Sequence, residues 1–475
     1  MATRRAGVAY NTCMQVADHP KLTKKAFLKF AEGYKIQRWN DRARTGQLVE
    51  LDHFGQKMML AYIIGTLEEE KNNTLDWGTI IYGGILHYIR KLKYFDMKPE
   101  VWSSIIKSIQ DEDKDFDPYY EALRDWESLI PNNLWTTLKE SSESLNKLGS
   151  SLRDEEGGDW SQFSKKGPKE LAYSVLYAAH KLASYWEFLS IRPINSHNPE
   201  TEDTSRELLK EIQALDYLDG VARMLNDNTR LSRFFGKISN LRYQQRWSHT
   251  YKQPPSTVMG HSALVSLFSA LFLHFIGMSR KTHCRPLIEN TFWGALFHDL
   301  PEAATRDIVK PVKEALQKKG KEDLIRRTEM KLFRELLVTI YDENGPSHAN
   351  YKKLYDRIIY YSTGILDIAK ASLEDDSEFN DRYIDSGQVV FESTKDFINL
   401  CDLAEDKKQV SGRIIRLSDI LAAYIEATQS IKAGIQDDEF QGAVQRIRDL
   451  ITQTKIDVEY YGVDLKHILT DITGE

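Results

Sequence analysis

The chain has 475 residues, of which 41% are hydrophobic and 28% are charged, so it can build more than one large core and is not a disordered polymer. Its formal net charge of −6 and isoelectric point near 6.1 argue against binding to duplex nucleic acid. Its three cysteines are widely spaced, which excludes a disulfide framework and a thiolate zinc cluster and fits a reducing cytoplasm.

Helices are predicted along the whole chain. Apolar residues recur at helical spacing in residues 53–67, 171–189, 330–341 and 412–428, whereas the alternating runs typical of strands are scarce. The sequence therefore predicts an all-α fold.

The longest apolar run, Ala263–Met278, is interrupted by serines and by His274, and it is too short to cross a bilayer. We therefore expect a buried helix and no membrane partner. An isolated histidine on an apolar helix is usually a packed core residue, which is our interpretation of His274 and His467. No apolar stretch follows the N-terminal arginines, so we expect no signal peptide and a cytoplasmic protein.

Three pairs of matching segments indicate two related halves. In each half an Arg-Trp pair precedes a histidine by the same interval, with Trp39 before His53 and Trp247 before His261. Downstream, YGGILHYIRKLKYFD lines up with WGALFHDLPEAATRD, and HKLASYWE lines up with SDILAAYIE. Three ordered matches are hard to obtain by chance, so we infer a tandem duplication with diverged copies.

The polar, proline-containing segment 191–205 separates the two sets of matches. The sequence therefore predicts two tandem helical bundles, comprising residues 1–210 and residues 211–475.

In the second half, histidines and carboxylates interrupt apolar helical segments. His298 and Asp299 end the apolar run Phe292–Phe297, Asp419 lies between two apolar stretches, and His261 precedes the longest one. Ionisable groups in apolar surroundings are paired or bind a metal. Imidazole and carboxylate together suit a divalent transition metal, and the helices of a bundle can direct all four side chains to one point.

The order His, His-Asp, Asp and the string HDLPEAATRDIVKPVK resemble the HD-domain metal-dependent phosphohydrolases, and in particular their bacterial 5′-deoxynucleotidase branch. The resemblance covers residues 230–430 well and residues 30–190 in degraded form. It implies that His261, His298, Asp299 and Asp419 bind a divalent metal, which could be Mn, Co, Mg, Fe, Ni or Zn. It also implies hydrolysis of deoxyribonucleoside 5′-monophosphates by water that the metal activates.

The resemblance further implies roles for residues around the metal. Glu302 resembles the catalytic acid/base, Arg246 the arginine that holds the phosphate, and Trp247 the aromatic neighbour of the nucleoside. Asp307 resembles an aspartate of the catalytic set that meets the sugar 3′-hydroxyl and disfavours ribose, although it could also cap the following helix. Glu302 has the required position only if the helix continues through Pro301 or restarts there.

The first half departs from the pattern of the family. It presents three imidazoles, His53, His87 and His180, and has Tyr88 in place of the aspartate of the dyad. Three histidines can hold zinc, but the missing carboxylate favours a copy that has kept the packing and lost catalysis. Because members of this branch form homodimers, such a copy could replace the second subunit as an intramolecular pseudo-dimer, with further homo-oligomers left open.

The interval between Asp299 and Asp419 is longer than in compact members of the family, which predicts an insertion or lid within residues 320–405. Two other classes of function remain. A deoxynucleoside triphosphate hydrolase or another nucleotide phosphodiesterase could use the same centre. A nucleotide-binding sensor without catalysis is the opposing class, and Glu302 and Asp307 argue against it.

Overall fold

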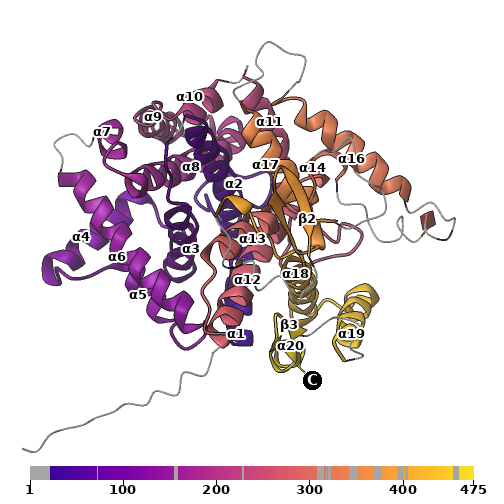
Figure 1. Ribbon diagram of the computed structural model, residues 1–475. Helices are drawn as coiled ribbons and strands as arrows, with labels where there is room; N and C mark the ends of the chain where they lie inside the picture. Colours follow the sequence, from indigo (N-terminus) through magenta and orange to yellow (C-terminus); the bar gives the residue numbers. More distant parts are fainter. Residues whose placement is uncertain are drawn as a thin grey trace, which may run out of the picture.

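The structure, a computed structural model, is almost entirely helical over the residues that it describes (Figure 1). It describes residues 22–71, 73–154, 159–226, 229–306, 315–316, 318, 323–341, 351–366, 377–392, 401, 405–452 and 459–474. The strands in this part of the chain form two short antiparallel hairpins, β1 with β2 and β3 with β4. The predicted all-α fold is confirmed.

The described elements follow one another along the chain mainly as helices. The first half contains α1 (Lys24–Phe30), η1 (Ala31–Tyr34), α2 (Glu50–Glu70), α3 (Trp77–Tyr94), α4 (Pro99–Glu112), α5 (Pro118–Arg124), α6 (Asn132–Asp154), α7 (Trp160–Ser164), α8 (Pro168–Ile191), η2 (Arg192–Asn195) and α9 (Glu200–Gln213). The second half contains α10 (Asp219–Leu225), α11 (Arg230–Ile238), η3 (Ser239–Arg242), α12 (Val258–Ser279), α13 (Arg285–Phe297), α14 (Glu302–Thr305), α16 (Asp323–Leu337), α17 (Lys352–Thr363), η4 (Ser377–Phe379), β1 (Arg382–Asp385), β2 (Gln388–Phe391), η6 (Glu405–Lys407), α18 (Gly412–Lys432), α19 (Asp438–Thr452), β3 (Glu459–Tyr460), β4 (Val463–Asp464) and α20 (Lys466–Thr473).

Two long buried helices, α2 and α12, form the centre of the molecule and pack against each other (Figure 1). Helix α2 also packs against α8 and α3, and α12 packs against α18 and α13. Glycines allow the two central helices to approach closely. A Cβ on Gly55 would lie 3.0 Å from the carbonyl oxygen of Met259, and a Cβ on Gly260 would lie 2.5 Å from Asp52 Oδ1. One continuous hydrophobic cluster therefore includes residues of both halves.

Helix α12 contains the long apolar run of the sequence. The helix has 22 residues and is long and apolar enough to cross a membrane, so the expectation that the run is too short for this was wrong. However, 83% of its most apolar window is buried inside the protein, as in the core helix of a globular protein. The expected buried helix is therefore present, and burial rather than length distinguishes it from a membrane span.

Several local features recur at the same spacing in the two halves. A 3-10 turn, η1 or η3, precedes the long central helix in each half. The backbone of Trp39 has a φ of 53° and that of Trp247 a φ of 59°, a conformation that is uncommon for residues other than glycine. An isolated antiparallel bridge then joins a glutamine to the residue before the long helix, and these bridges are Gln37 with Val49 and Gln245 with Thr257.

Two segments that the sequence singled out are partly helical. The expected linker, residues 191–205, contains η2 and the start of α9. Two hydrogen bonds support these turns: the Asn195 side chain donates to the backbone carbonyl oxygen of Ile191, and the backbone carbonyl oxygen of Asn195 accepts from Thr201 Oγ1. The division after residue 210 falls within α9 and stays a prediction. In residues 320–405, the described helix α17 packs against α13 and α2, and the proposed lid also stays a prediction.

Candidate metal centre

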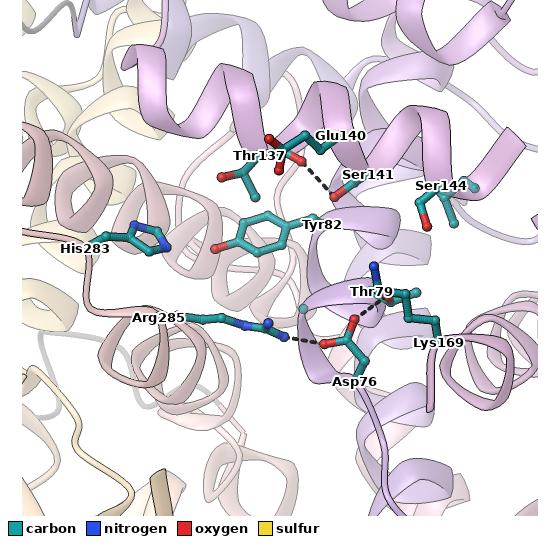
Figure 2. Close-up of a pocket in the computed structure, with 12 residues that line it drawn as sticks. Asp76, Thr79, Tyr82, Thr137, Glu140, Ser141, Ser144, Lys169, His283 and Arg285 are labelled. Atoms are coloured by element: carbon teal, nitrogen blue, oxygen red, sulfur yellow. Dashed lines mark hydrogen bonds and ion pairs between the residues drawn. The ribbon is translucent and has the colours of Figure 1, made fainter. Parts of the chain in front are cut away.

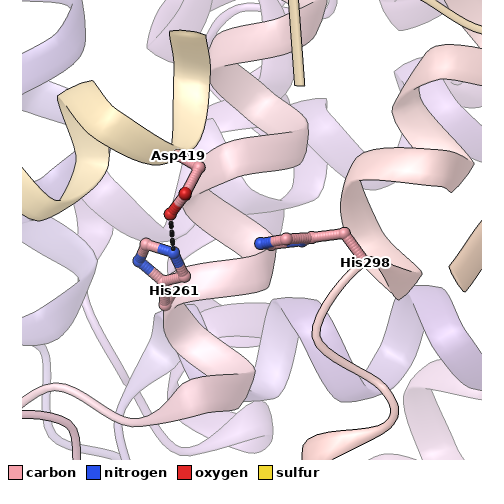
Figure 3. A group of neighbouring side chains, drawn as sticks. All are labelled: His261, His298 and Asp419. Carbon is pink, nitrogen blue, oxygen red and sulfur yellow. Dashed lines mark hydrogen bonds and ion pairs between the residues drawn. The ribbon is translucent and has the colours of Figure 1, made fainter. Parts of the chain in front are cut away.

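Three side chains from three helices meet in the second half (Figure 3). His261 lies near the start of α12, His298 follows the last residue of α13, and Asp419 lies in α18. One nitrogen or oxygen from each lies within 4.8 Å of the other two. Within the part of the chain that the structure describes, no other three His, Cys, Asp or Glu side chains meet in this way.

His261 is fully buried and lies between two carboxylates. Its Nδ1 is 3.1 Å from Glu426 Oε1, and its Nε2 is 2.8 Å from Asp419 Oδ1. Burial and the charge of Arg246 lower the pKa of His261, but the two carboxylates outweigh them and raise it to about 9. For the acid Asp419 the effect of burial has the opposite sign and raises the pKa, but the hydrogen bond with His261 and the nearby cations outweigh it and lower the pKa to about 2. The site therefore favours positive charge where these side chains meet.

His298 has one nitrogen fixed by the backbone. Its Nδ1 lies 2.7 Å from the carbonyl oxygen of Ala295. Because a carbonyl can only accept, Nδ1 is the donor in this contact, and Nε2 is the nitrogen that can bind a metal. Nε2 is buried and makes no hydrogen bond, and Asp299 Oδ1 lies 3.3 Å from it. A backbone or carboxylate partner on the far nitrogen is the usual support for a metal-binding imidazole.

Asp299 lies beside the three side chains. Its Oδ2 is 3.9 Å from His261 Nε2 and 3.8 Å from a terminal nitrogen of Arg246. The side chains of Asp299 and Asp419 are 19% and 31% exposed, whereas that of His261 is 0% exposed. The carboxylates therefore lie on the open side of the group and the imidazoles behind them.

Glu302 begins a new helix rather than continuing the one before it. Helix α13 ends at Phe297, and α14 starts at Glu302 directly after Pro301. Of the two geometries that the sequence left open, the structure has the restart, because a proline is favourable where a helix begins and unfavourable within one. Asp307 and the neighbouring Lys310 and Lys313 lie outside the described residues.

Glu426 is a buried residue of this centre that the sequence analysis missed. Burial raises its pKa, but the Arg246 and His261 charges outweigh this effect and hold the pKa well below its usual range. Glu426 lies two helical turns after Asp419 on the same side of α18, and it ends the string SDILAAYIE that has a counterpart in the first half. Its partners are Arg246 Nε at 3.2 Å, Trp247 Nε1 at 3.0 Å, Tyr34 OH at 2.9 Å and His261 Nδ1 at 3.1 Å.

These contacts also locate the two predicted substrate-binding residues. Arg246 and Trp247 both use a side-chain N–H to hold Glu426, and the Trp247 ring packs against Phe440 of α19, with 5.1 Å between ring centroids. The terminal nitrogens of Arg246 extend from this contact toward Asp299.

The first half contains the same arrangement around Glu187 of α8. One oxygen of this buried carboxylate accepts from two side chains of the first half, and the other lies near His53 and Arg242. The partners are Arg38 Nε at 2.9 Å, Trp39 Nε1 at 2.8 Å, His53 Nδ1 at 3.1 Å and Arg242 Nη2 at 2.9 Å. Glu187 and Glu426 therefore hold corresponding residues in the two halves.

The imidazoles of the first half differ from those of the second in their partners. His53 Nε2 lies 3.0 Å from His180 Nδ1, and His87 Nε2 lies 3.0 Å from the hydroxyl of Tyr119. Burial, assisted by nearby basic side chains, lowers the pKa of both His87 and His180 well below the usual value. This cluster has no carboxylate in the place of Asp419.

A separate cavity of about 250 Å³ lies at the junction of α3, α6 and the start of α13 (Figure 2). Arg285 of α13 reaches across it to form an ion pair with Asp76. Its wall also includes Tyr82, Thr137 and His283. None of the four proposed metal ligands lines this cavity, so it is distinct from the metal centre.

Residues 233–370 match the model of a protein family described as 5′-deoxynucleotidase YfbR-like. The matched segment contains Arg246, His261, the His298-Asp299 pair and Glu302, and it ends before Asp419. No curated protein and no solved structure matches the chain. Over this segment the second half is similar to HD-type 5′-deoxynucleotidases, a family of hydrolases, and the similarity supports an enzymatic function.

Proposed function

We propose that this protein is a metal-dependent phosphohydrolase that hydrolyses deoxyribonucleoside 5′-monophosphates. The observation that carries the proposal is the meeting of His261, His298 and Asp419, with an Nε2 of each imidazole directed toward the shared point. The match of residues 233–370 to a 5′-deoxynucleotidase family supports the reaction type.

The donor atoms present fit a divalent ion. The buried Nε2 of His298 has no hydrogen bond, and it lies close to carboxylate oxygens and a second imidazole, a combination that suits Mn, Co, Mg, Fe, Ni or Zn. His261, His298, Asp299 and Asp419 would hold the ion. When bound, a divalent ion lowers the pKa of water and polarises a phosphoryl oxygen.

The residues around this centre would perform the remaining steps. The terminal nitrogens of Arg246 would bind the phosphate, since a guanidinium forms two parallel hydrogen bonds to phosphate oxygens. Glu302 would accept the proton of the attacking water and give one to the leaving 5′-oxygen. Trp247 would pack near the nucleoside, and Asp307 would meet the 3′-hydroxyl and disfavour ribose.

The decisive measurement is phosphate release by the full chain from a panel of ribo- and deoxynucleotides with Mn²⁺, Co²⁺ or Mg²⁺. We expect phosphate release from deoxynucleoside monophosphates. In Asp299→Ala the rate of release should fall by at least about 100-fold, which is more than the loss of a residue that only supports a metal ligand would cause. Tyr88→Phe, at the corresponding position of the first half, is the control and should retain activity. Tripolyphosphate release from triphosphates would contradict the monoester substrate, and nucleotide binding without turnover would identify a sensor.

We also propose that the chain is a tandem duplication in which the first half acts as an inactive second subunit. The recurrent bridges, the positive φ values at Trp39 and Trp247, and the paired carboxylates Glu187 and Glu426 support this proposal. The close packing of α2 on α12 would correspond to the subunit interface. An isolated second half should therefore expose the apolar face of α12 and aggregate, and a soluble, fully active fragment 216–475 would contradict the proposal.

One divalent ion per chain is the expected stoichiometry. The imidazoles of the first half have His180, and no carboxylate, in the place of Asp419, so the charge of a second cation would be less well compensated there. Elemental analysis and calorimetric titration should give one site, which Asp419→Ala removes and His180→Ala does not. A second ion that is lost in His180→Ala would show that the first half binds metal.

A further inference from the structure

Each half contributes one side chain to the buried carboxylate of the other half. Tyr34, the last residue of η1, extends from the first half to Glu426 of the second, with 2.9 Å between its hydroxyl and Oε1. Arg242, the last residue of η3, extends from the second half to Glu187 of the first, also at 2.9 Å. Each buried carboxylate therefore has one partner from the other half.

Tyr34 is held tightly against the helix that carries His261. The residue is 1% exposed, and the ammonium of Lys252 lies 5.3 Å from the centre of its ring. A Cβ on Gly260, the residue before His261, would lie 2.7 Å from Tyr34 Cε1. The absence of a side chain at Gly260 therefore lets Tyr34 pass directly beside the first turn of α12.

A second residue of the first half supports the same turn. Asp52 Oδ1 accepts a hydrogen bond of 2.7 Å from Thr257 Oγ1, and this hydroxyl accepts a hydrogen bond from the backbone N–H of Gly260. Thr257 is the N-cap of α12. The first half therefore fixes both the start of the helix that carries His261 and, through Tyr34, the carboxylate behind its imidazole.

We propose that Tyr34 is a positioning residue of the metal centre, supplied by the first half and acting through Glu426 on His261. A carboxylate has about four acceptor sites, and the four N–H and O–H partners of Glu426 account for all of them. Oε2 is held by Arg246 and Trp247, whereas Oε1 is held by Tyr34 and by the imidazole itself. Without the hydroxyl, Oε1 has His261 as its remaining partner, and the carboxylate is held through Oε2 alone, so it fixes the orientation of the ring less firmly.

The test is Tyr34→Phe in the full chain, which keeps the ring beside Gly260 and removes only the hydroxyl. We expect calorimetry to show Co²⁺ binding that is about 10-fold weaker, which is the lower end of the effect of removing a residue that supports a metal ligand. The visible absorption band of the bound Co²⁺ should also change. Tyr82→Phe is the matched control. Its hydroxyl also crosses from the first half to an imidazole of α12, His274 Nε2 at 3.1 Å, but away from the centre. This variant should retain both the affinity and the spectrum.

Two results would overturn the inference. One is a Tyr34→Phe protein with the Co²⁺ affinity and spectrum of the wild type. The other is an equal loss of affinity in Tyr82→Phe, because this would indicate general loosening of α12. The inference rests on the proposed function, and the wild-type protein distinguishes failure of one from failure of the other. If the wild type binds no Co²⁺, the proposed function and the positioning role both fail. If the wild type binds Co²⁺ and Tyr34→Phe binds it equally well, only the positioning role fails.

Discussion

Glu426→Gln should weaken Co²⁺ binding by about 10- to 100-fold and lower the free energy of unfolding by about 3 kcal/mol. The substitution keeps the volume of the side chain but removes the charge that three N–H groups and one hydroxyl share. One end of the amide can only donate, so at least one buried donor loses its acceptor, and the Arg246 guanidinium loses the nearer of its two counter-charges. The imidazole of His261 then has no fixed partner behind it.

Glu187→Gln provides the matched control for this prediction. It removes the same charge from the corresponding partners, including the ion pairs with Arg38 of the first half and Arg242 of the second. It should lower the free energy of unfolding by a similar amount, again about 3 kcal/mol, and leave Co²⁺ affinity unchanged. Urea unfolding and calorimetric titration of the two variants separate stability from metal binding. Equal Co²⁺ affinities would show that Glu426 supports only the fold.

His274→Gln should make the protein more resistant to acid than the wild type. His274 is fully buried in α12, and burial, assisted by the charge of His283, lowers its pKa from 6.5 to about 3. The folded protein therefore binds fewer protons at this site than the unfolded chain at pH values between these limits. Burial of neutral His274 therefore does not reduce the free energy of unfolding above pH 6.5, but it does so increasingly as the pH falls toward 3. The reduction is already about 2 kcal/mol at pH 5.

Glutamine can still accept a hydrogen bond from Tyr82, and it does not titrate. Relative to the wild type, the variant should therefore gain about 2 kcal/mol between pH 7.5 and pH 5, measured by urea unfolding at both values. His467→Gln is the control because His467 is exposed, contrary to our interpretation of it as a core residue, so its substitution leaves the core unchanged. If the free energies of unfolding of His274→Gln and the wild type differ by the same amount at pH 7.5 and at pH 5, the burial of a neutral imidazole is contradicted.

The helical fold and the meeting of His261, His298 and Asp419 could be anticipated from local patterns. Helical periodicity extends over many residues, and an ionisable group within an apolar face indicates that a partner or a metal lies nearby. The restart of the helix after Pro301 could not be decided in the same way, because proline both begins helices and interrupts them.

The role of Glu426 could not be assigned from the sequence, although its counterpart Glu187 ends the matching string. A buried carboxylate shows that partners exist, but the partners come from tertiary packing. Tyr34 and Glu426 are 392 positions apart in the chain, and no periodicity relates η1 to α18. Contacts between the halves depend on the fit of whole helices, such as the close approach of α2 and α12 at Gly55 and at Gly260, and single residues do not predict them.

The placement of carboxylates in front of imidazoles has a consequence for the sequence of binding events. Under the proposed function, an incoming phosphate ester would first meet Asp299 and Asp419, whose two negative charges would repel it while they are uncompensated. Arg246 already shares its charge with Glu426 and Asp299. The proposed function therefore implies that the cation binds before the nucleotide, an order that would appear in steady-state kinetics as nucleotide saturation only at occupied metal sites.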